Sequence, residues 1–450
     1  MPSIITRGAA SAKGFGAFTT IGSKYWLGAY GTTRVSYCQG ATMDSSGNLY
    51  TVGAIYNATY SNVDLLVCKY GISGALLWQR ALSRANGSQV QGYGIHTDGS
   101  YVYISGLEDA AFSYYNEMLS AVYDVSGTLI WKQSLYGASY TVGQAASNDA
   151  SGNLYAIGYS LQSSTGFDMV TAKYNSAGIL QWQRLLASSG AAAEYGYSIA
   201  VDSSSNVIVG GQGYSGVSAA VLAKYNSSGT IQWQRALYQG TGYYATVIQG
   251  VAVDASNNIY ATGYWYDTQS VPPYSPIKYR RFTVKYDSSG TLQWQRELSG
   301  TGDETGLAIS VDSSSNVYTI GSSASSAGTV VIVKYNSSGT LQWQRYISNT
   351  GLNINGSHGG IACYGSSYGF TALGSGVLLS GRLPSDGTKT GSYSVGGTTY
   401  TYAASSLTDA AGSMTSTTSS FTDSAFGYTS ASPSMTAYVP TATYTAVPVT

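Results

Sequence analysis

A tandem repeat of about 50 residues is the feature that most constrains the fold of this chain. Six copies of a phrase of the form KYNSSGTLQWQR begin at positions 69, 122, 173, 224, 285 and 334. Its tryptophan recurs at Trp78, Trp131, Trp182, Trp233, Trp294 and Trp343, and Trp26 stands one period earlier. The spacings are 52, 53, 51, 51, 61 and 49 residues. The chain is therefore built from one small unit copied in tandem.

A second phrase alternates with the first and completes the unit. This phrase reads IAVDSSSNVIVGG at 199–211. It has close copies at 41–53, 147–158, 251–263 and 309–321, and divergent copies at 94–106 and 361–374. Each period then holds four short strands with alternating apolar residues, joined by Asn-, Asp-, Ser- and Gly-rich turns. Four antiparallel strands repeated seven times predict an all-β fold, a seven-bladed β-propeller with extended N- and C-terminal arms.

The ends of the repeat predict how the ring closes. The residues around Trp26 look like a fourth strand without the three that precede it, and the last set of three strands, near 358–383, lacks a tryptophan strand after it. Pairing the two closes the ring. Residues 388–395 are the alternative source of this seventh outer strand, and we favour Trp26 because the alternative has no tryptophan at the matching place. Trp182, Trp233, Trp294 and Trp343 should be largely buried between blades.

The repeat resembles that of the seven-bladed β-propeller (SBBP-like) repeat proteins, which combine a D-S-S-G-N-x-Y turn with a K-Y-x-x-S-G-x-L-x-W hairpin. The resemblance covers about 24–388. It implies a fold more than a function, because such proteins include bacterial surface, secreted and phage proteins.

The segments outside the repeat differ from it in composition. We expect an N-terminal arm at 1–22, the propeller at 23–388, a β-hairpin at 389–402 and an extended Ser/Thr-rich C-terminal arm at 403–450. The last segment has 21 Ser or Thr among its 48 residues. Its only charged residues are Asp409 and Asp423, and aromatic residues occur at intervals along it. We expect this arm to dock on a neighbouring subunit.

Composition excludes several classes of function. Lys plus Arg and Asp plus Glu are both 21, so the net charge gives no basis for binding nucleic acid or an anionic membrane. Three cysteines are too few for a disulfide framework, and no apolar run is long enough for a membrane-spanning helix. The N-terminus lacks the apolar core of a secretory signal.

The variable connections carry the candidate binding residues. In a propeller, the turns within the two hairpins of a blade lie on one face, and the other connections lie on the opposite face. Here the first set is nearly constant from blade to blade, whereas the second set varies and is rich in tyrosine. The longest variable connection is the insert at 264–281. Tyrosine-rich loops on a rigid scaffold are typical of binding surfaces. The candidates for ligand or receptor contact, or for packing between subunits, are Tyr56, Tyr60, Tyr114, Tyr115, Tyr195, Tyr197, Tyr243, Tyr244, Trp265, Tyr266, Tyr274, Tyr279, Arg280 and Arg281.

The other polar residues of the repeat favour structural roles. We expect the repeated aspartates, such as Asp44 and Asp202, to cap their own turns, and the repeated Lys and Arg to be solvated at strand ends. The acids of the variable connections fall in different blades. His96, His358 and Cys363 form no local metal-binding cluster. We therefore predict no cofactor, no metal site and no catalytic activity.

Three functions are compatible with these features of the sequence. The first is a virion structural protein of a bacteriophage, in a tail, a fibre or a head decoration, which uses the propeller for assembly or host attachment. Its partners would be other virion proteins, copies of itself, or a host surface glycan or receptor, without nucleic acid or membrane insertion. The second is a bacterial surface or secreted sugar-binding adhesin, and the third is an enzyme. The missing signal and the low-charge arms favour the first, with release from the host cytoplasm by lysis.

Overall fold

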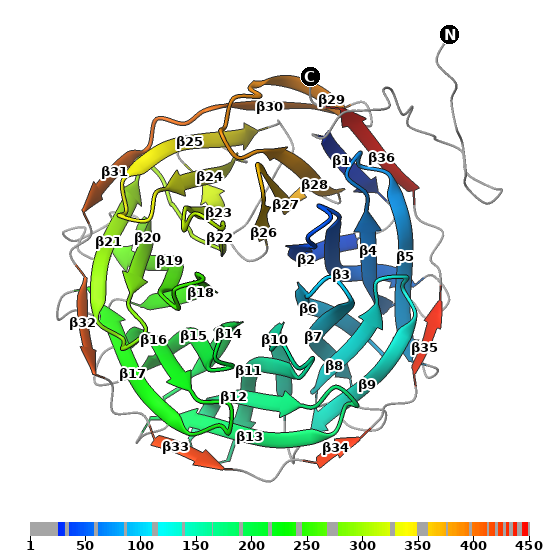
Figure 1. Cartoon of the computed structure of the whole chain (residues 1–450), viewed down its shortest axis with the longest axis vertical. Helices are drawn as coiled ribbons and strands as arrows, with labels where there is room; N and C mark the ends of the chain where they lie inside the picture. The colour runs from blue at the N-terminus through cyan, green and yellow to red at the C-terminus, as the bar shows by residue number, and fades with distance from the viewer. Residues whose placement is uncertain are drawn as a thin grey trace, which may run out of the picture.

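The computed structural model of the chain is a ring of seven β-sheets around a central opening (Figure 1). All of the regular elements that the structure describes are strands. This is the seven-bladed β-propeller that the repeat predicts, with four antiparallel strands from the repeat in each blade. The structure describes residues 26–31, 36–57, 62–84, 88–109, 116–136, 140–163, 165–188, 192–214, 218–239, 245–267, 278–324, 329–348, 359–374, 377–395, 398–411, 414–418, 422–425, 429–431, 435–438 and 443–448.

The first six blades follow the chain in order, from the centre of the ring outward. Blade one is β2 (Ser36–Met43), β3 (Leu49–Asn57), β4 (Asn62–Tyr70) and β5 (Leu76–Arg84). Blade two is β6 (Val90–Thr97), β7 (Tyr101–Asp109), β8 (Asn116–Asp124) and β9 (Leu129–Tyr136). Blade three is β10 (Thr141–Asn148), β11 (Leu154–Gln162), β12 (Gly166–Tyr174) and β13 (Leu180–Ala187). Blade four is β14 (Tyr195–Val201), β15 (Val207–Tyr214), β16 (Ser218–Tyr225) and β17 (Ile231–Tyr238). Blade five is β18 (Thr246–Val253), β19 (Ile259–Asp267), β20 (Lys278–Tyr286) and β21 (Leu292–Ser299). Blade six is β22 (Ala308–Val311), β23 (Val317–Ser323), β24 (Thr329–Tyr335) and β25 (Leu341–Ser348).

Blade seven joins the two ends of the repeat. It combines β26 (Gly359–Tyr364), β27 (Ser367–Gly374) and β28 (Val377–Pro384) with β1 (Trp26–Gly31) from the start of the chain. Trp26 pairs with Arg382 and Gly31 with Val377 in antiparallel register. The N-terminal strand thus supplies the seventh outer strand. The alternative segment forms β29 (Gly391–Val395), which pairs instead with β30 (Thr398–Ala404) at the outside of blade six.

The first turn of blades one to six is held by an aspartate, as predicted. Asp44 Oδ1 accepts hydrogen bonds from the backbone N–H of Ser46 and Asn48, both at 2.9 Å. Its Oδ2 accepts from the Asn48 amide and from the Tyr50 hydroxyl. Asp149, Asp202, Asp254 and Asp312 cap their turns in the same way. These carboxylates therefore fix tight turns and do not form a common binding ring.

The hydrophobic core lies between neighbouring blades. Tyr50, Val52 and Leu65 of blade one, for example, pack in one cluster with Val102 and Ile104 of blade two. A single four-stranded sheet cannot bury both of its faces, so each blade is stable only against the next one.

The repeated Lys, Trp and Arg connect adjacent blades, which corrects two predictions. Trp182 is half-buried rather than largely buried, and its indole N–H donates to the Ser227 carbonyl in the last turn of the next blade, at 3.1 Å. Lys173 donates to the same carbonyl, and Arg184 donates to that of Gly229. The equivalent tryptophans and arginines of blades one, four, five and six make the same contacts. These cations are therefore structural and not merely solvated strand ends.

The C-terminal segment forms a belt around the ring. Its strands are β30 and then β31 (Thr408–Ala411), β32 (Thr415–Thr418), β33 (Thr422–Ala425), β34 (Thr429–Ala431), β35 (Met435–Tyr438) and β36 (Thr443–Pro448). Each pairs antiparallel with the outer strand of one blade, in the order six, five, four, three, two, one and seven. Figure 1 shows the last six as brown to red strands around the ring.

The belt corrects the prediction that the tail docks on a neighbouring subunit. The ring itself offers seven open strand edges, and a Thr-rich segment with short strands can pair with each edge in turn. The tail therefore finds its partners within its own chain.

Candidate functional site

The two faces of the ring differ in the connections that they carry. The turn between the first and second strands and the turn between the third and fourth strands of each blade form what we call the repeat face. The remaining connections form what we call the variable face. The repeat face is occupied by the turn caps and the contacts between blades described above, so the variable face and the central opening are the places left for a site.

An aromatic cluster lies on the variable face between blades three and four. Tyr159 at the end of β11 contacts Phe167 at the start of β12 with ring centroids 5.5 Å apart, and Tyr195 at the start of β14 at 5.0 Å. Tyr140 stacks on Tyr159 at 6.4 Å, and Tyr197 stacks on Tyr195 at 6.1 Å. All five side chains are half-buried. We call this set the aromatic cluster; it places five partly exposed rings side by side, four on strands and that of Tyr140 immediately before β10.

The phenols of Tyr140, Tyr159 and Tyr195 in the aromatic cluster remain protonated at neutral pH. Burial raises the pKa of Tyr159 to about 12, and the neighbouring Tyr140 and Tyr195 add to the rise. Burial also raises the pKa of Tyr140 and of Tyr195. Each hydroxyl can therefore donate a hydrogen bond while its ring offers an apolar face, which is the combination that suits a binding surface.

Two acids of blade two meet on the variable side, although the sequence suggested that such acids are scattered. Glu108 and Glu117 lie directly opposite each other on β7 and β8. Glu108 is fully buried, accepts a hydrogen bond from the Ser134 hydroxyl, and lies 3.0 Å from Nε of Arg84 in blade one. Burial raises the pKa of Glu108 to about 8, with Arg84 opposing the rise. The contact between Arg84 and Glu108 connects blades one and two.

A second pair of acids lies under the aromatic cluster. Asp168 and Glu194 are both fully buried. Glu194 accepts hydrogen bonds from the backbone N–H of Ser188 and of Tyr214, and Asp168 accepts one from the Thr165 hydroxyl. Burial raises the pKa of each, and the Asp168 charge adds to the rise at Glu194. These contacts hold the connections that carry the aromatic rings.

The structure brings together only some of the predicted binding residues. Tyr195 and Tyr197 belong to the aromatic cluster, whereas Tyr56 is half-buried at the end of β3 in another blade. Tyr279 is half-buried on β20 and contacts Tyr264 at 5.4 Å. The side chain of Tyr266 and the whole of Tyr60, Tyr114, Tyr115, Tyr243, Tyr244 and Tyr274 lie outside the described residues.

Two residues of the blade-five insert belong to the core, which corrects their prediction as contact residues. Trp265 is 6% exposed and packs in the cluster that also contains Ile248 and Phe282. Arg281 is 1% exposed and donates to the carbonyls of Thr305 and Val331 in blade six. Arg280, its half-buried neighbour, lies over the Trp265 ring. The ends of the insert extend β19 and β20, so their alternate residues face the core.

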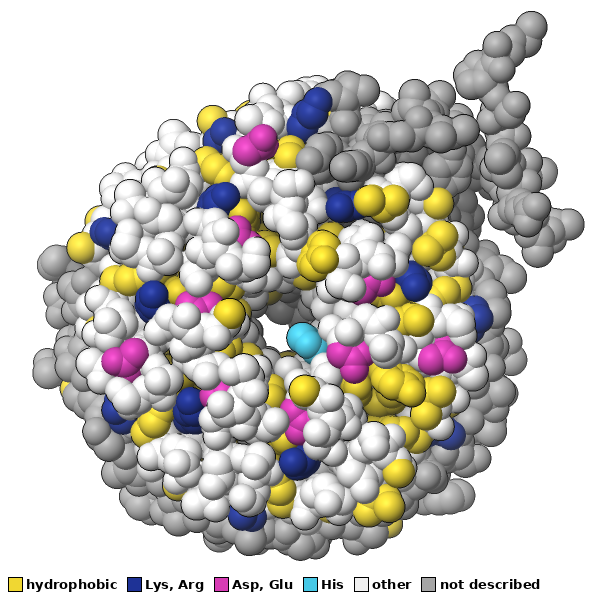
Figure 2. Space-filling view, in the orientation of Figure 1, with side chains coloured by type: hydrophobic (Ala, Val, Ile, Leu, Met, Phe, Trp, Pro, Cys, Tyr) yellow, Lys and Arg dark blue, Asp and Glu magenta, His cyan; other side chains and the backbone are white. Residues whose placement is uncertain are grey.

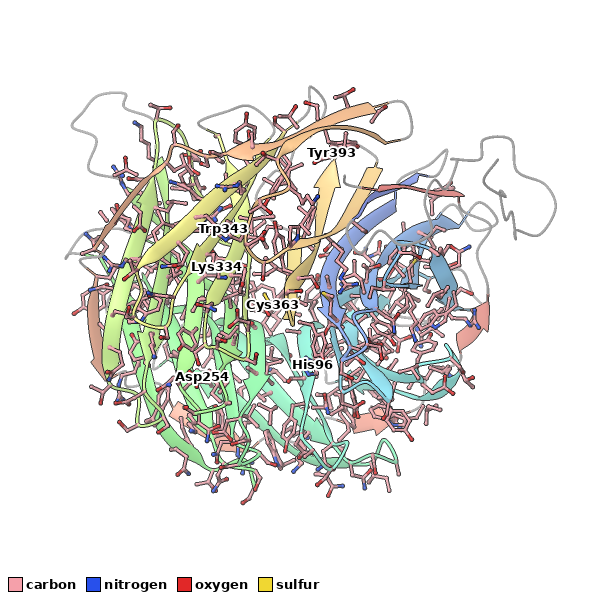
Figure 3. All side chains as sticks on the ribbon, turned by 45° about the horizontal axis from the view of Figure 1, so that its top comes forward. His96, Asp254, Lys334, Trp343, Cys363 and Tyr393 are labelled. Atoms are coloured by element: carbon pink, nitrogen blue, oxygen red, sulfur yellow. The ribbon has the colours of Figure 1, made fainter. Side chains whose placement is uncertain are left out.

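The central opening contains a cavity of about 390 Å³, lined by the inner strands of all seven blades. Figure 2 shows the opening with a histidine at its edge, and Figure 3 shows His96 and Cys363 toward the centre of the ring. Burial lowers the pKa of His96 and raises that of the Cys363 thiol. The thiol is therefore protonated at neutral pH, and His358 lies outside the described residues.

Sequence reasoning missed Tyr140, Tyr159 and Phe167. Tyr159 and Phe167 stand at strand ends within the repeat and so looked like ordinary alternating strand residues. A usable signal was present in the sequence. Aromatic residues near the end of one strand and the start of the next lie beside the connection between them, and this connection belongs to the variable face of the ring.

The structure shows neither a metal centre nor a membrane helix in the part of the chain that it describes. No group of three or more His, Cys, Asp or Glu is placed to hold a metal ion there. Within the same residues, no helix is long and apolar enough to cross a membrane.

The chain is similar in sequence to one known family. The model of that family, described as outer membrane protein assembly factor BamB, matches residues 66–275. The match runs from blade one into the insert of blade five. A comparison with curated proteins finds no match.

Several solved propellers are similar to the ring. The β-propeller domain of the trilobed protease from Pyrococcus furiosus is 9% identical, with a TM-score of 0.42 over 78% of this chain and 96% of that chain. An α-L-arabinofuranosidase from Fusarium graminearum is 9% identical, with a TM-score of 0.43 over 79% and 94%. An ulvan lyase, a polysaccharide lyase, is 10% identical, with a TM-score of 0.44 over 78% and 94%.

The prediction that the chain is not an enzyme is not supported by these matches, because the similar propellers include a glycosidase and a polysaccharide lyase. At 9–10% identity the likeness concerns the fold, and no residue role is transferred from these proteins.

Proposed function

We propose that the protein is a structural component of a bacteriophage particle, whose propeller is a rigid ring that contacts a partner in the particle or on the host through its variable face. The aromatic cluster carries this proposal. Five half-buried rings in two neighbouring blades form a surface with large apolar area and hydroxyl donors, as contact surfaces require.

The belt supports the same assignment. It pairs the outer edge of all seven blades, so these edges are not open to an added strand from a partner. Partners then approach one of the two faces. On the repeat face, the side chains of the turns and outer strands already bond to the neighbouring blade.

The proposal has a direct test in phage particles. The protein should be found by mass spectrometry in purified particles, and its absence from them would contradict the virion assignment. Tyr140→Ala and Tyr195→Ala should reduce particle assembly or adsorption to the host at least tenfold, while the melting temperature of the isolated protein stays within a few degrees.

A tyrosine of the repeat face gives the matched control. Tyr101 is 41% exposed at the start of β7, and Tyr101→Ala should assemble and adsorb like the wild type. Normal assembly and adsorption of the two cluster variants would show that the aromatic cluster is not the contact surface.

A sugar-binding adhesin on a bacterial surface is the second candidate. The stacked tyrosines of the aromatic cluster favour it, because aromatic rings beside hydroxyl donors suit sugars. Surface labelling of intact bacteria with an antibody to the protein distinguishes the adhesin from a virion component.

A further inference from the structure

Five inner strands carry a β-bulge at the same place, and the bulged residue is always Gln or Tyr. The register shifts between Cys38 and Gly40 in blade one, and equivalent shifts occur in blades two to five. The residues at the shifts are Gln39, Tyr93, Gln144, Tyr197 and Gln249. Each stands five positions before the turn aspartate of its blade, and all five line the central cavity. We call them the bulge ring.

The close approach of the inner strands fixes the bulge ring in place. Gly94 follows the bulge of blade two, and a Cβ on it would lie 2.3 Å from the Cα of Ala145 in blade three. In blade four the Ser198 hydroxyl accepts a hydrogen bond from the Val251 N–H of blade five, at 2.9 Å. In these two blades the backbone beside the bulge is held close to the next blade, so the side chains project from a rigid frame.

The bulge ring offers neutral hydrogen-bonding groups. The structure gives the amides of Gln39 and Gln249 no hydrogen-bond partner among the described residues, although both line the cavity. The Tyr93 hydroxyl donates to Gln91 at 3.0 Å, and Gln144 bonds to Tyr159 of the aromatic cluster. An amide both donates and accepts, so the ring suits groups that do the same, such as sugar hydroxyls.

The lining selects against charged ligands. No Asp, Glu, Lys or Arg occurs among the described residues that line the cavity. Its histidine, His96, is neutral at pH 7 because burial lowers its pKa. A charged ligand would lose hydration there without meeting an opposite charge. The cavity volume of about 390 Å³ lies within the size range of small-molecule sites.

We propose that the central channel binds a neutral saccharide, whose hydroxyls bond to the glutamine amides and whose ring lies against Tyr93 or Tyr197. This site is distinct from the contact surface proposed above and does not depend on it. Tyr197 belongs to both sets, so only the other bulge residues separate the two sites experimentally.

Saccharide binding by the purified full chain tests the proposal. Saturation-transfer NMR with glucose, galactose, N-acetylglucosamine, maltose and lactose identifies a bound sugar, and calorimetry gives its affinity. Glucuronic acid and N-acetylneuraminic acid are the charged comparisons. At least one of the neutral sugars should bind. Neither acidic sugar should bind more tightly than that neutral sugar. Gln249→Leu and Tyr93→Phe should each weaken binding about tenfold, since each removes hydrogen bonds to the ligand or to its frame.

Gln232→Leu is the matched control, because Gln232 is an exposed glutamine on the outer strand β17. It should leave the affinity unchanged. Tyr93→Phe removes a single oxygen and keeps the proposal testable if Gln249→Leu does not fold. The proposal is overturned if no neutral sugar binds at millimolar concentration, or if an acidic sugar binds more tightly than every neutral one. It is also overturned if both Gln249→Leu and Tyr93→Phe bind the sugar as tightly as the wild type. If Tyr140→Ala loses binding while Gln249→Leu and Tyr93→Phe keep it, the sugar binds at the aromatic cluster, and the channel site is equally overturned.

Discussion

At the scale of single residues, burial separates two adjacent arginines that look alike in sequence. Arg281 lies in the core between blades five and six, where its Nε and Nη1 donate to Thr305 and Val331. Gly321 makes room for it, since a Cβ there would lie 2.5 Å from Nη2. Burial lowers the pKa of Arg281 to about 10, and the Glu304 carboxylate opposes this change. Arg280 instead lies 3.6 Å from Glu297 and is partly exposed.

Arg281→Ala should therefore lower the free energy of unfolding by roughly 3 kcal/mol or more, because two buried carbonyls lose a charged donor and a cavity remains. Arg280→Ala removes a partly exposed ion pair and should cost under about 1 kcal/mol. Urea denaturation of both variants measures the difference. Equal losses would mean that the guanidinium of Arg281 does not hold the two blades together.

At the scale of elements, the outer hairpins of blades two to seven are each held by the blade before them. The Trp182 indole bonds to Ser227 and packs on Gly229, whose φ of 78° favours glycine and where a Cβ would lie 2.8 Å from the ring. Trp182→Ala should cost about 2 kcal/mol, from one hydrogen bond and the lost apolar contact. Ile179, on the preceding turn, is 61% exposed, so Ile179→Ala should change stability by under about 0.5 kcal/mol. Thermal unfolding of both variants checks this. A cost at Trp182 no larger than that at Ile179 would argue against the contact between blades.

At the scale of the whole molecule, the belt decides which surfaces remain open. Removing residues 407–450 deletes β31 to β36 and uncovers the outer strands of six blades. Exposed strand edges pair with other chains, so this truncation should lower the melting temperature and raise the mass measured by light scattering. A shorter truncation of residues 441–450 removes β36 alone and should have a much smaller effect on both. If the long truncation leaves the mass and the melting temperature unchanged, the belt does not protect the outer strand edges from pairing with other chains.

The blade count, the strand order within a blade, the turn caps and the closing strand all follow from the sequence alone. Period-2 alternation, D-S-S-G-N turns and regularly recurring tryptophans are local signals. Because the same local pattern recurs seven times, it predicts a ring of seven similar sheets. The five-residue offset of Gln39 and Tyr93 from their turn aspartates was also present in the sequence, but its meaning depends on the bulge.

The long-range contacts, by contrast, depend on how the strands pack in three dimensions. The tail pairs with its own ring because seven open edges lie close to it, which composition does not reveal. Trp265 and Arg281 became core residues because β19 and β20 extend into the insert, and the register of these strands decides which side chains face inward. The aromatic cluster likewise joins Tyr140 and Tyr197 from two blades, and these side chains come together only through the packing of one blade on the next.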